Sequence, residues 1–295
     1  MHRILTAATA FLLCGLASGA PLADAPYAYE AAKTGPVTYG APKTLAPGIT
    51  ARSIEYVSAS GQRVTGEIIA GAATSPQPGV LFVHWLGDPA TTNHTEFEKD
   101  AQALAARGVT SILIDTMWSV PKWFRHMGAS VETDSKETID QVIDMRTALD
   151  VLLAQKNVDP ARLVFVGHDF GAMLGALMAS VDARAQYFVY LAANPVLTKW
   201  YTLGKSSPTH DAYVAAMAKF DILGALRASK PKAVLMQFSA HDEFVTPDEA
   251  ATFFNAAPLP RGAFFYDADH GLATAPVFRD RQAWLVEQLF GDAPH

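Results

Sequence analysis

The residues that most clearly indicate chemistry surround Asp169, in the sequence GHDFG at positions 167–171. A short apolar run precedes this segment and a helical stretch follows it, which predicts a strand that turns sharply into a helix. The two glycines permit a tight turn that exposes the central side chain above the sheet. A carboxyl group with an ordinary pKa of about 3.9 is ionised at neutral pH without help from a base. Asp169 is therefore a candidate nucleophile.

With serine in place of Asp169, this segment would be the nucleophile elbow of an α/β-hydrolase. From the predicted hairpin at 51–70 to the last residue, the chain resembles the α/β-hydrolase superfamily, and its layout is similar to that of dienelactone hydrolases. The GHDFG segment itself resembles the elbows of epoxide hydrolases and haloalkane dehalogenases, which have aspartate at this position. The resemblance implies a hydrolase that needs no cofactor.

The same resemblance implies the other members of the site, in the order nucleophile, acid, histidine. Asp242 follows the predicted strand 233–238 and matches the acid, with Glu243 the less suitable neighbour. His270 follows the predicted strand 263–268 and matches the histidine that acts as a base. The three residues each stand at the end of a predicted strand, where they would converge on one site.

The predicted strand that ends at His84 leads into a loop that resembles the His-Gly loop of the superfamily. Trp85 replaces the usual glycine there. The backbone N–H groups of Trp85 and Phe170 are the candidate donors of an oxyanion hole. We also expect the Trp85 indole to narrow the pocket beside the reaction centre.

Two long segments, 116–136 and 195–231, interrupt the pattern of predicted strands and helices. Long connections in compact α/β domains commonly form lids or pocket walls. Their aromatic residues are candidates for a substrate pocket, and covering a small satellite core is the alternative; the five are Trp118, Trp123, Trp200, Tyr201 and Tyr213. The two tyrosines could also protonate an epoxide oxygen, or simply pack.

Three function classes remain open on these residues. The first is a hydrolase that opens an epoxide or displaces a halide, with a covalent ester on Asp169 that water activated by His270 then cleaves. The second is an ester or lactone hydrolase of dienelactone hydrolase type, in which Asp169 acts directly or as a base towards water. The third is a catalytically silent binding member of the superfamily. All three predict a small-molecule ligand.

The surrounding pattern alternates short apolar runs with helical periodicity. Alternation over this length predicts an α/β fold with a mostly parallel sheet and helices on both faces. We expect an extended N-terminal arm over 20–50, a helix over 137–155 and a single α/β-hydrolase domain over 51–295. The segment 195–231 is expected to be a short lid inserted in that domain.

The first 19 residues have the layout of a signal peptide, with Arg3 before an apolar run and small residues after it. The sequence therefore predicts an exported protein, periplasmic or secreted, without stable membrane insertion after cleavage; an uncleaved membrane anchor is the alternative. The net charge of −6 argues against a nucleic-acid binder. The single cysteine, Cys14, lies in the apolar run, and no Cys/His spacing predicts a metal site.

Overall fold

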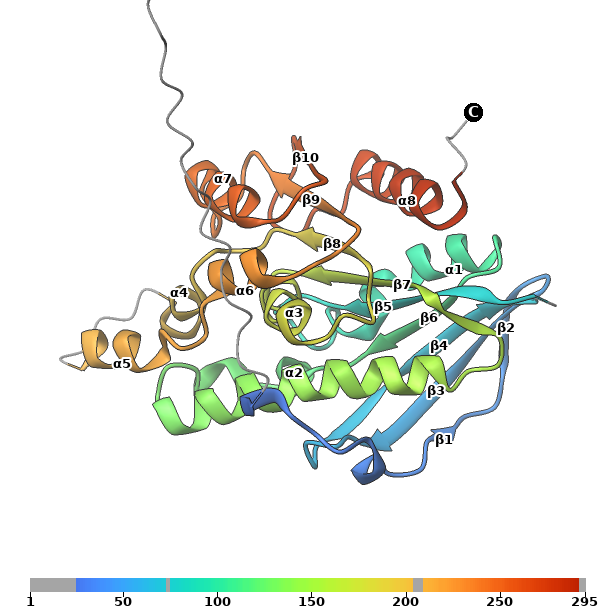
Figure 1. The fold of residues 1–295 in the computed structure, drawn as a ribbon, viewed down its shortest axis with the longest axis horizontal. Helices are drawn as coiled ribbons and strands as arrows, with labels where there is room; N and C mark the ends of the chain where they lie inside the picture. Colours follow the sequence, from blue (N-terminus) through green and yellow to red (C-terminus); the bar gives the residue numbers. More distant parts are fainter. Residues whose placement is uncertain (1–24, 73–74, 204–208, 292–295) are drawn as a thin grey trace, which may run out of the picture.

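The computed structural model of the chain describes residues 25–72, 75–203 and 209–291, so the predicted signal peptide at 1–19 lies outside the described residues. The ten strands in these ranges form one sheet in the order β1-β3-β4-β6-β5-β7-β8-β9-β10, with β2 paired to β3. Figure 1 shows this sheet with helices on either side of it. The α/β class predicted from the sequence is confirmed.

The neighbouring strands β6, β5, β7, β8, β9 and β10 pair in parallel. Strands β1 and β2 pair antiparallel with β3, β3 with β4, and β4 with β6. Their bounds are β1 Thr38–Tyr39, β2 Lys43–Ala46, β3 Ile49–Val57, β4 Arg63–Gly71, β5 Gln77–Val83, β6 Thr110–Ile114, β7 Val158–His168, β8 Tyr187–Leu191, β9 Ala233–Ser239 and β10 Arg261–Tyr266.

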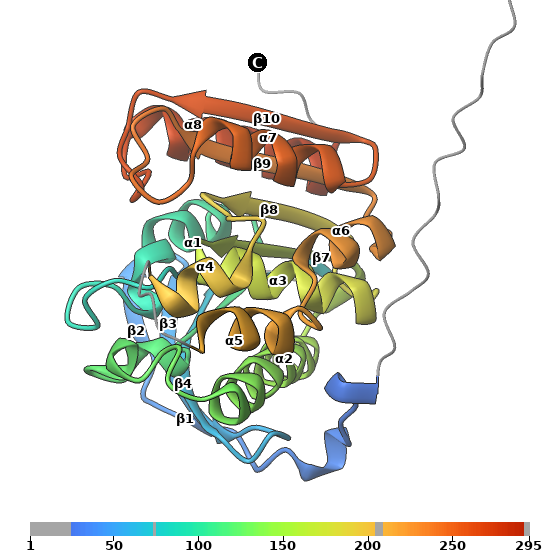
Figure 2. The same ribbon diagram turned by 90° about the vertical axis from the view of Figure 1, so that its left-hand side faces the viewer.

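The helices lie in two layers. The core between the sheet and α1 and α8 is separate from the core between the sheet and α2, α3, α6 and α7, and Figures 1 and 2 show the helices arranged in this way. Their bounds are α1 Glu98–Ala105, α2 Val131–Leu153, α3 Phe170–Val181, α4 Leu197–Thr202, α5 His210–Met217, α6 Ile222–Ala228, α7 Pro247–Ala256 and α8 Ala275–Phe290, with short 3-10 turns at Ala25–Tyr27, Ala31–Lys33, His94–Phe97, Met117–Ser119 and Trp123–Arg125.

Strand β7 shows why an apolar run without polar alternation becomes a central strand. Successive side chains of a strand point to opposite faces, so Leu163 and Phe165 enter the core beneath α2 and α3. Val164 and Val166 enter the core beneath α1 and α8. Both faces of β7 are covered from Leu163 to Val166, and this favours apolar residues at each of these positions.

The strand order places the candidate site at a switch point of the sheet. The chain passes from β5 outward to β6, and then returns to the other side of β5 to form β7, β8, β9 and β10. The connection after β5 therefore leads towards β6, and the connection after β7 leads in the opposite direction along the sheet, towards β8. Open α/β sheets bind ligands at this place, beyond the carboxyl ends of the strands.

Two predicted elements differ in extent from the structure. The arm at 20–50 is not merely extended, because β1 and β2 both pair with β3 and widen the sheet. Helix α2 begins at Val131, six residues before the predicted start, because Ser130 accepts a hydrogen bond from the Thr133 N–H and caps it.

The predicted insertion at 195–231 contains α4, α5 and α6 between β8 and β9. Helix α6 contributes Ala225 and Leu226 to the core on the α3 side, so this part of the segment belongs to the main body. Helix α4 carries Trp200, which is 5% exposed. Among the described residues, none of the helices is long and apolar enough to cross a membrane.

Candidate active site

Asp169 occupies a strained turn between β7 and α3. Its backbone angles are φ 53° and ψ −114°, in a region that residues with a side chain rarely adopt. The turn is held on both sides, since the Asp169 N–H donates to Leu191 O at 2.8 Å and the Asp169 carbonyl accepts from the Met173 N–H at 2.9 Å. The predicted sharp strand-to-helix turn is therefore present.

Glycine is required at 171 because of the close approach of β5. A Cβ atom at Gly171 would lie 2.5 Å from Val83 O and 2.9 Å from His84 O. At Gly167 it would lie 2.8 Å from the backbone N of Ala172. Real Cβ atoms do not come so near to backbone atoms, so the GHDFG pattern reflects tight packing of the turn against its neighbours.

The Asp169 carboxyl group is fully buried. Its Oδ2 accepts a hydrogen bond from the Leu86 N–H at 3.1 Å, and the backbone N–H of Phe170 also favours the charged form. Burial raises the pKa of Asp169 from 3.8 to about 6, and the charges of His270 and His168 and the two backbone N–H groups limit the rise. Asp169 is thus a base whose pKa lies near neutrality.

His270 and Asp242 form a closely hydrogen-bonded pair. His270 Nδ1 lies 2.9 Å from both carboxylate oxygens of Asp242. Asp242 is itself fixed, because its Oδ1 accepts from the N–H groups of Phe244 at 2.8 Å and Val245 at 2.9 Å. Burial favours the neutral carboxyl, but the hydrogen bond with His270, its charge and the two N–H groups hold the pKa of Asp242 below its ordinary value.

The opposite ring nitrogen of His270 faces Asp169. His270 Nε2 lies 3.9 Å from Asp169 Oδ1, and both atoms are buried without a hydrogen-bond partner. Burial lowers the pKa of His270, but the hydrogen bond with Asp242 and the charges of Asp169 and Asp242 more than offset it and leave the pKa above its ordinary value. The three residues predicted from the sequence therefore converge.

The structure differs from the prediction at one of the two oxyanion donors. The Trp85 N–H donates to Glu96 Oε2 at 3.0 Å, so it is not directed at Asp169. The next N–H along the loop, that of Leu86, is the one that donates to Asp169. The Trp85 indole nevertheless lies beside the reaction centre as expected, with its ring centroid 5.5 Å from that of His270.

Glu96 and His168 form a connection that the sequence did not reveal. Glu96 Oε1 lies 2.6 Å from His168 Nδ1, and the His168 Nε2–H donates to the backbone carbonyl of His270 at 3.0 Å. Glu96 thus links the loop at Trp85, the turn at Asp169 and the loop of His270. Both ring nitrogens of His168 therefore have hydrogen-bond partners, which fixes the orientation of the imidazole beside Asp169.

The five aromatic residues predicted to line a substrate pocket have different surroundings. The Tyr201 hydroxyl is 2.8 Å from Thr138 Oγ1, and the Tyr213 hydroxyl donates to Asp134 Oδ2 at 2.7 Å. Both tyrosines are buried in the core at these bonds, so neither hydroxyl is free to protonate an epoxide. These two tyrosines therefore pack in the large core on the α2 and α3 side of the sheet, and not in a small satellite core.

The indole N–H groups of Trp118 and Trp123 are also engaged, with Trp85 O and Glu137 Oε2, each at 3.1 Å. Trp200 is different, because its side chain stands beside His270, with ring centroids 5.6 Å apart. It also lines a cavity of about 750 Å³ together with Leu86 and Phe244. Asp169 and His270 do not line this cavity themselves, but Leu86, which donates to Asp169, and Trp200, which stands beside His270, do.

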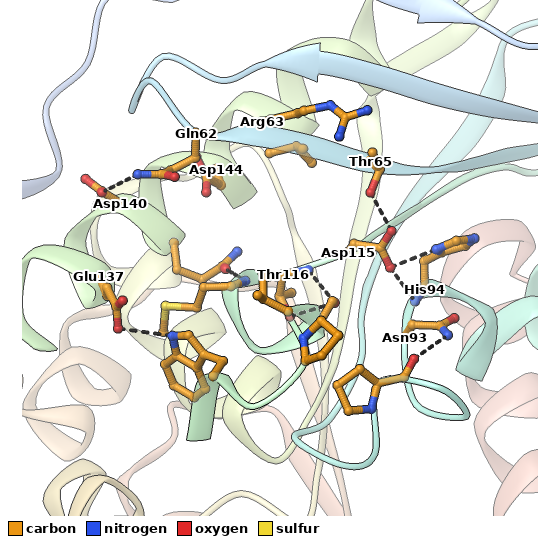
Figure 3. Close-up of a pocket in the computed structure, with 18 of the residues that line it drawn as sticks. Gln62, Arg63, Thr65, Asn93, His94, Asp115, Thr116, Glu137, Asp140 and Asp144 are labelled. Carbon is orange, nitrogen blue, oxygen red and sulfur yellow. Dashed lines mark hydrogen bonds and ion pairs between the residues drawn. The ribbon is translucent and has the colours of Figure 1, made fainter. Parts of the chain in front are cut away.

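A second cavity of about 770 Å³ adjoins the first and shares Pro89, Ser119, Pro121 and Lys122 with it. Figure 3 shows its carboxylates engaged by neighbouring side chains. Asp115 accepts from Thr65 at 2.6 Å and lies 2.8 Å from His94 Nδ1. Neither Asp169 nor His270 lines this cavity.

A metal site is not apparent in the described ranges, where no group of three or more His, Cys, Asp or Glu side chains is arranged to hold an ion. The side chains of the site are instead hydrogen-bonded to one another and to backbone N–H groups.

No protein-family model and no curated protein sequence matches the chain. Solved structures do match it. An acetyl xylan esterase from Paenibacillus sp. R4 has a TM-score of 0.70 and 15% identity over 87% of this chain and 89% of its own.

An α/β-hydrolase from Penicillium sp. sh18 has a TM-score of 0.58 and 13% identity over 82% of this chain and 99% of its own. A putative dienelactone hydrolase from Klebsiella pneumoniae has a TM-score of 0.57 and 17% identity over 81% and 98%. The sheet order, the turn at Asp169 and these likenesses together show that the chain has the α/β-hydrolase fold, with a layout like that of dienelactone hydrolases.

Proposed function

We propose that the protein is a hydrolase of small carboxylic esters or lactones, in which Asp169 and His270 together activate a water molecule. The observation that carries this proposal is the pair of buried, unpartnered atoms Asp169 Oδ1 and His270 Nε2, 3.9 Å apart. The likeness in fold to acetyl xylan esterases and to a dienelactone hydrolase supports esters or lactones as the substrate class.

The separation of the two atoms suits a shared water. A hydrogen bond to water is about 2.8 Å long, so one water oxygen can bond both atoms across a gap of 3.9 Å. Such a water keeps an electron pair for the carbonyl carbon of a substrate. Two direct contacts would also fix its orientation, which lowers the entropy cost of the attack.

The directions of the two pKa shifts assign the roles. Above a pKa of about 6, Asp169 is a carboxylate that accepts the proton of the attacking water. The raised pKa of His270 favours its protonated form, and in that form Nε2–H gives its proton to the departing alkoxide. The new C–O bond comes from water, the C–O bond to the alcohol breaks, and Asp242 stabilises the imidazolium charge.

A panel of short-chain esters and lactones tests this function, with Asp169→Asn and His270→Gln as the inactive variants and Asp267→Asn as the control. Asp267 is 94% exposed on its side chain, so its substitution should leave turnover unchanged. A single turnover in H2(18)O should place the label in the acid product and none in Asp169. Wild-type protein that cleaves no ester or lactone would overturn the proposal.

A second candidate is attack by Asp169 at a saturated carbon, and one observation favours it. Oδ2 is held by the Leu86 N–H while Oδ1 is unpartnered. Displacement of a halide by Oδ1 would form an alkyl ester whose carbonyl oxygen is Oδ2, already next to a donor. Water activated by His270 would then attack that carbonyl.

The epoxide form of this second reaction has less support, because the hydroxyls of Tyr201 and Tyr213 are engaged elsewhere. Mass spectrometry of His270→Gln incubated with a short alkyl halide decides between the two candidates. An alkyl adduct on Asp169, in a protein without ester turnover, would replace the first candidate by the second.

We also propose that the protein is exported, which rests on the composition of residues 1–19 alone. Sequencing the N-terminus of the protein recovered from outside the cytoplasm tests this. An N-terminus at Met1 in the recovered protein would contradict signal cleavage.

A further inference from the structure

The indole N–H of Trp200 is a buried donor without an acceptor among the residues that the structure describes. Buried tryptophan N–H groups usually have a partner, and leaving such a donor unsatisfied costs about 1–3 kcal/mol. The neighbouring Trp118 and Trp123 follow this rule, since each donates to an oxygen at 3.1 Å. Trp200 departs from this rule, so the acceptor of its N–H must come from a bound molecule and not from the described residues.

The surroundings of Trp200 indicate where that acceptor lies. Its ring centroid is 5.6 Å from His270, 5.2 Å from Phe244 and 6.2 Å from Phe170, the residue after Asp169. The same side chain lines the cavity of about 750 Å³. Trp200 thus lines this cavity and lies beside His270.

The proposed ester chemistry requires a donor at this place. Attack on an ester moves negative charge to the carbonyl oxygen, and donors aimed at that oxygen lower the barrier. Two nearby backbone donors are engaged, because the Leu86 N–H bonds Asp169 and the Trp85 N–H bonds Glu96. Among the buried side chains of the described residues, Trp200 carries an N–H donor without an acceptor beside His270.

We infer that the Trp200 Nε1–H binds the carbonyl oxygen of the ester substrate and stabilises the negative charge that develops on it. The inference rests on the proposed function and names a catalytic residue for it. It also explains why the buried N–H is left unpartnered, since a preorganised donor must be free before the substrate arrives.

The test compares Trp200→Phe with Trp284→Phe. Phenylalanine retains an aromatic ring and removes the N–H, and Trp284 lies on α8, next to Tyr187 at a ring separation of 6.4 Å, away from the site. Loss of one donor to a developing oxyanion lowers kcat about 100-fold. We expect that loss in Trp200→Phe with KM little changed, and near wild-type kinetics in Trp284→Phe.

A second measurement uses the wild-type protein, so it remains available if Trp200→Phe fails to fold. The indole N–H resonances of the five tryptophans are assigned by triple-resonance NMR and followed during titration with N-methylacetamide, whose carbonyl is not cleaved. The Trp200 resonance should move downfield, while that of Trp284 stays in place.

Equal kcat in the two folded variants would overturn the inference, as would a Trp200 resonance that does not move at saturating N-methylacetamide. These outcomes can be distinguished from a failure of the proposed ester hydrolysis. Wild-type protein without ester turnover would refute ester hydrolysis, while the titration would still report whether the Trp200 N–H binds a carbonyl oxygen.

Discussion

Replacing Asp169 by asparagine should lower the pKa of His270. Burial by itself lowers this pKa, and the hydrogen bond with Asp242 and the charges of Asp169 and Asp242 raise it above its ordinary value. Asparagine keeps the shape of the side chain and removes the charge that lies 3.9 Å from Nε2. The substitution therefore removes one raising contribution while leaving the other contacts of His270 in place.

The size of the effect follows from the separation. Two unit charges 3.9 Å apart interact by about 4 kcal/mol at an effective dielectric constant of about 20. This energy corresponds to about 3 pKa units. Because the amide dipole of asparagine replaces part of the lost interaction, we expect a fall of about 2 units.

An NMR titration of the nine histidines measures this change, with the His270 signal identified by its absence in His270→Gln. Asp267→Asn provides the control, because it removes the same charge from a solvent-exposed pair. Asp267 Oδ1 lies 2.7 Å from His241 Nε2, and the two side chains are 94% and 68% exposed. Solvent screening should keep the change at His241 small and leave His270 unaffected.

A pKa of His270 that stays within about half a unit of the wild-type value in Asp169→Asn would refute the reasoning. It would mean that the Asp169 carboxyl is not ionised in the pH range where His270 titrates. The acid–base roles assigned to the two residues would then have to be abandoned as well.

Three other variants test the surroundings of the site. Gly171→Ala should lower the free energy of unfolding in urea by about 1–3 kcal/mol, since its Cβ would lie 2.5 Å from Val83 O; unchanged stability would contradict the packing argument. Glu96→Gln should lower kcat/KM, because a single amide oxygen cannot replace both carboxylate oxygens, which contact the Trp85 N–H and His168 Nδ1; an unchanged kcat/KM would contradict this. Between pH 3.8 and about 6 folded Asp169 binds more protons than the unfolded chain, so its own contribution to stability falls with rising pH, by about 3 kcal/mol in all. Urea unfolding of wild type and Asp169→Asn across this range should show the difference in their free energies of unfolding changing by that amount, and a constant difference would contradict it.

Much of the fold could be predicted because its strands are short apolar runs separated by helical periodicity. The hairpin predicted over 51–70 corresponds to β3 and β4, and the runs at 163–167 and 233–238 lie within β7 and β9. The two strands of the N-terminal arm could not be predicted in this way, because Thr38–Tyr39 and Lys43–Ala46 show little apolar patterning. These strands form by pairing with the edge of β3, which local sequence does not reveal.

The positions of Asp169, Asp242 and His270 could be predicted because each follows a strand of the same sheet. The hydrogen bonds around them could not, because they depend on side chains that meet only in the folded chain. Glu96 is 72 residues from His168 in sequence, yet its carboxylate contacts the His168 imidazole and accepts a hydrogen bond from the Trp85 N–H. The sequence signal for this contact was the position of Glu96, shortly after the loop that was expected to form the oxyanion hole.

The distribution of unsatisfied atoms bears on whether the site is active. Asp169 has a strained backbone, and Asp169 Oδ1, His270 Nε2 and Trp200 Nε1 are all buried without partners. Each of these features costs stability, although the chain satisfies the adjacent atoms, including both nitrogens of His168 and both oxygens of Asp242. Functional sites are the places where folded proteins commonly keep a strained backbone or unpaired buried polar atoms. Three of the ten buried side-chain atoms without a partner in the described residues thus belong to Asp169, His270 and the neighbouring Trp200, and this gathering supports the proposal of a catalytic site over a silent member of the fold.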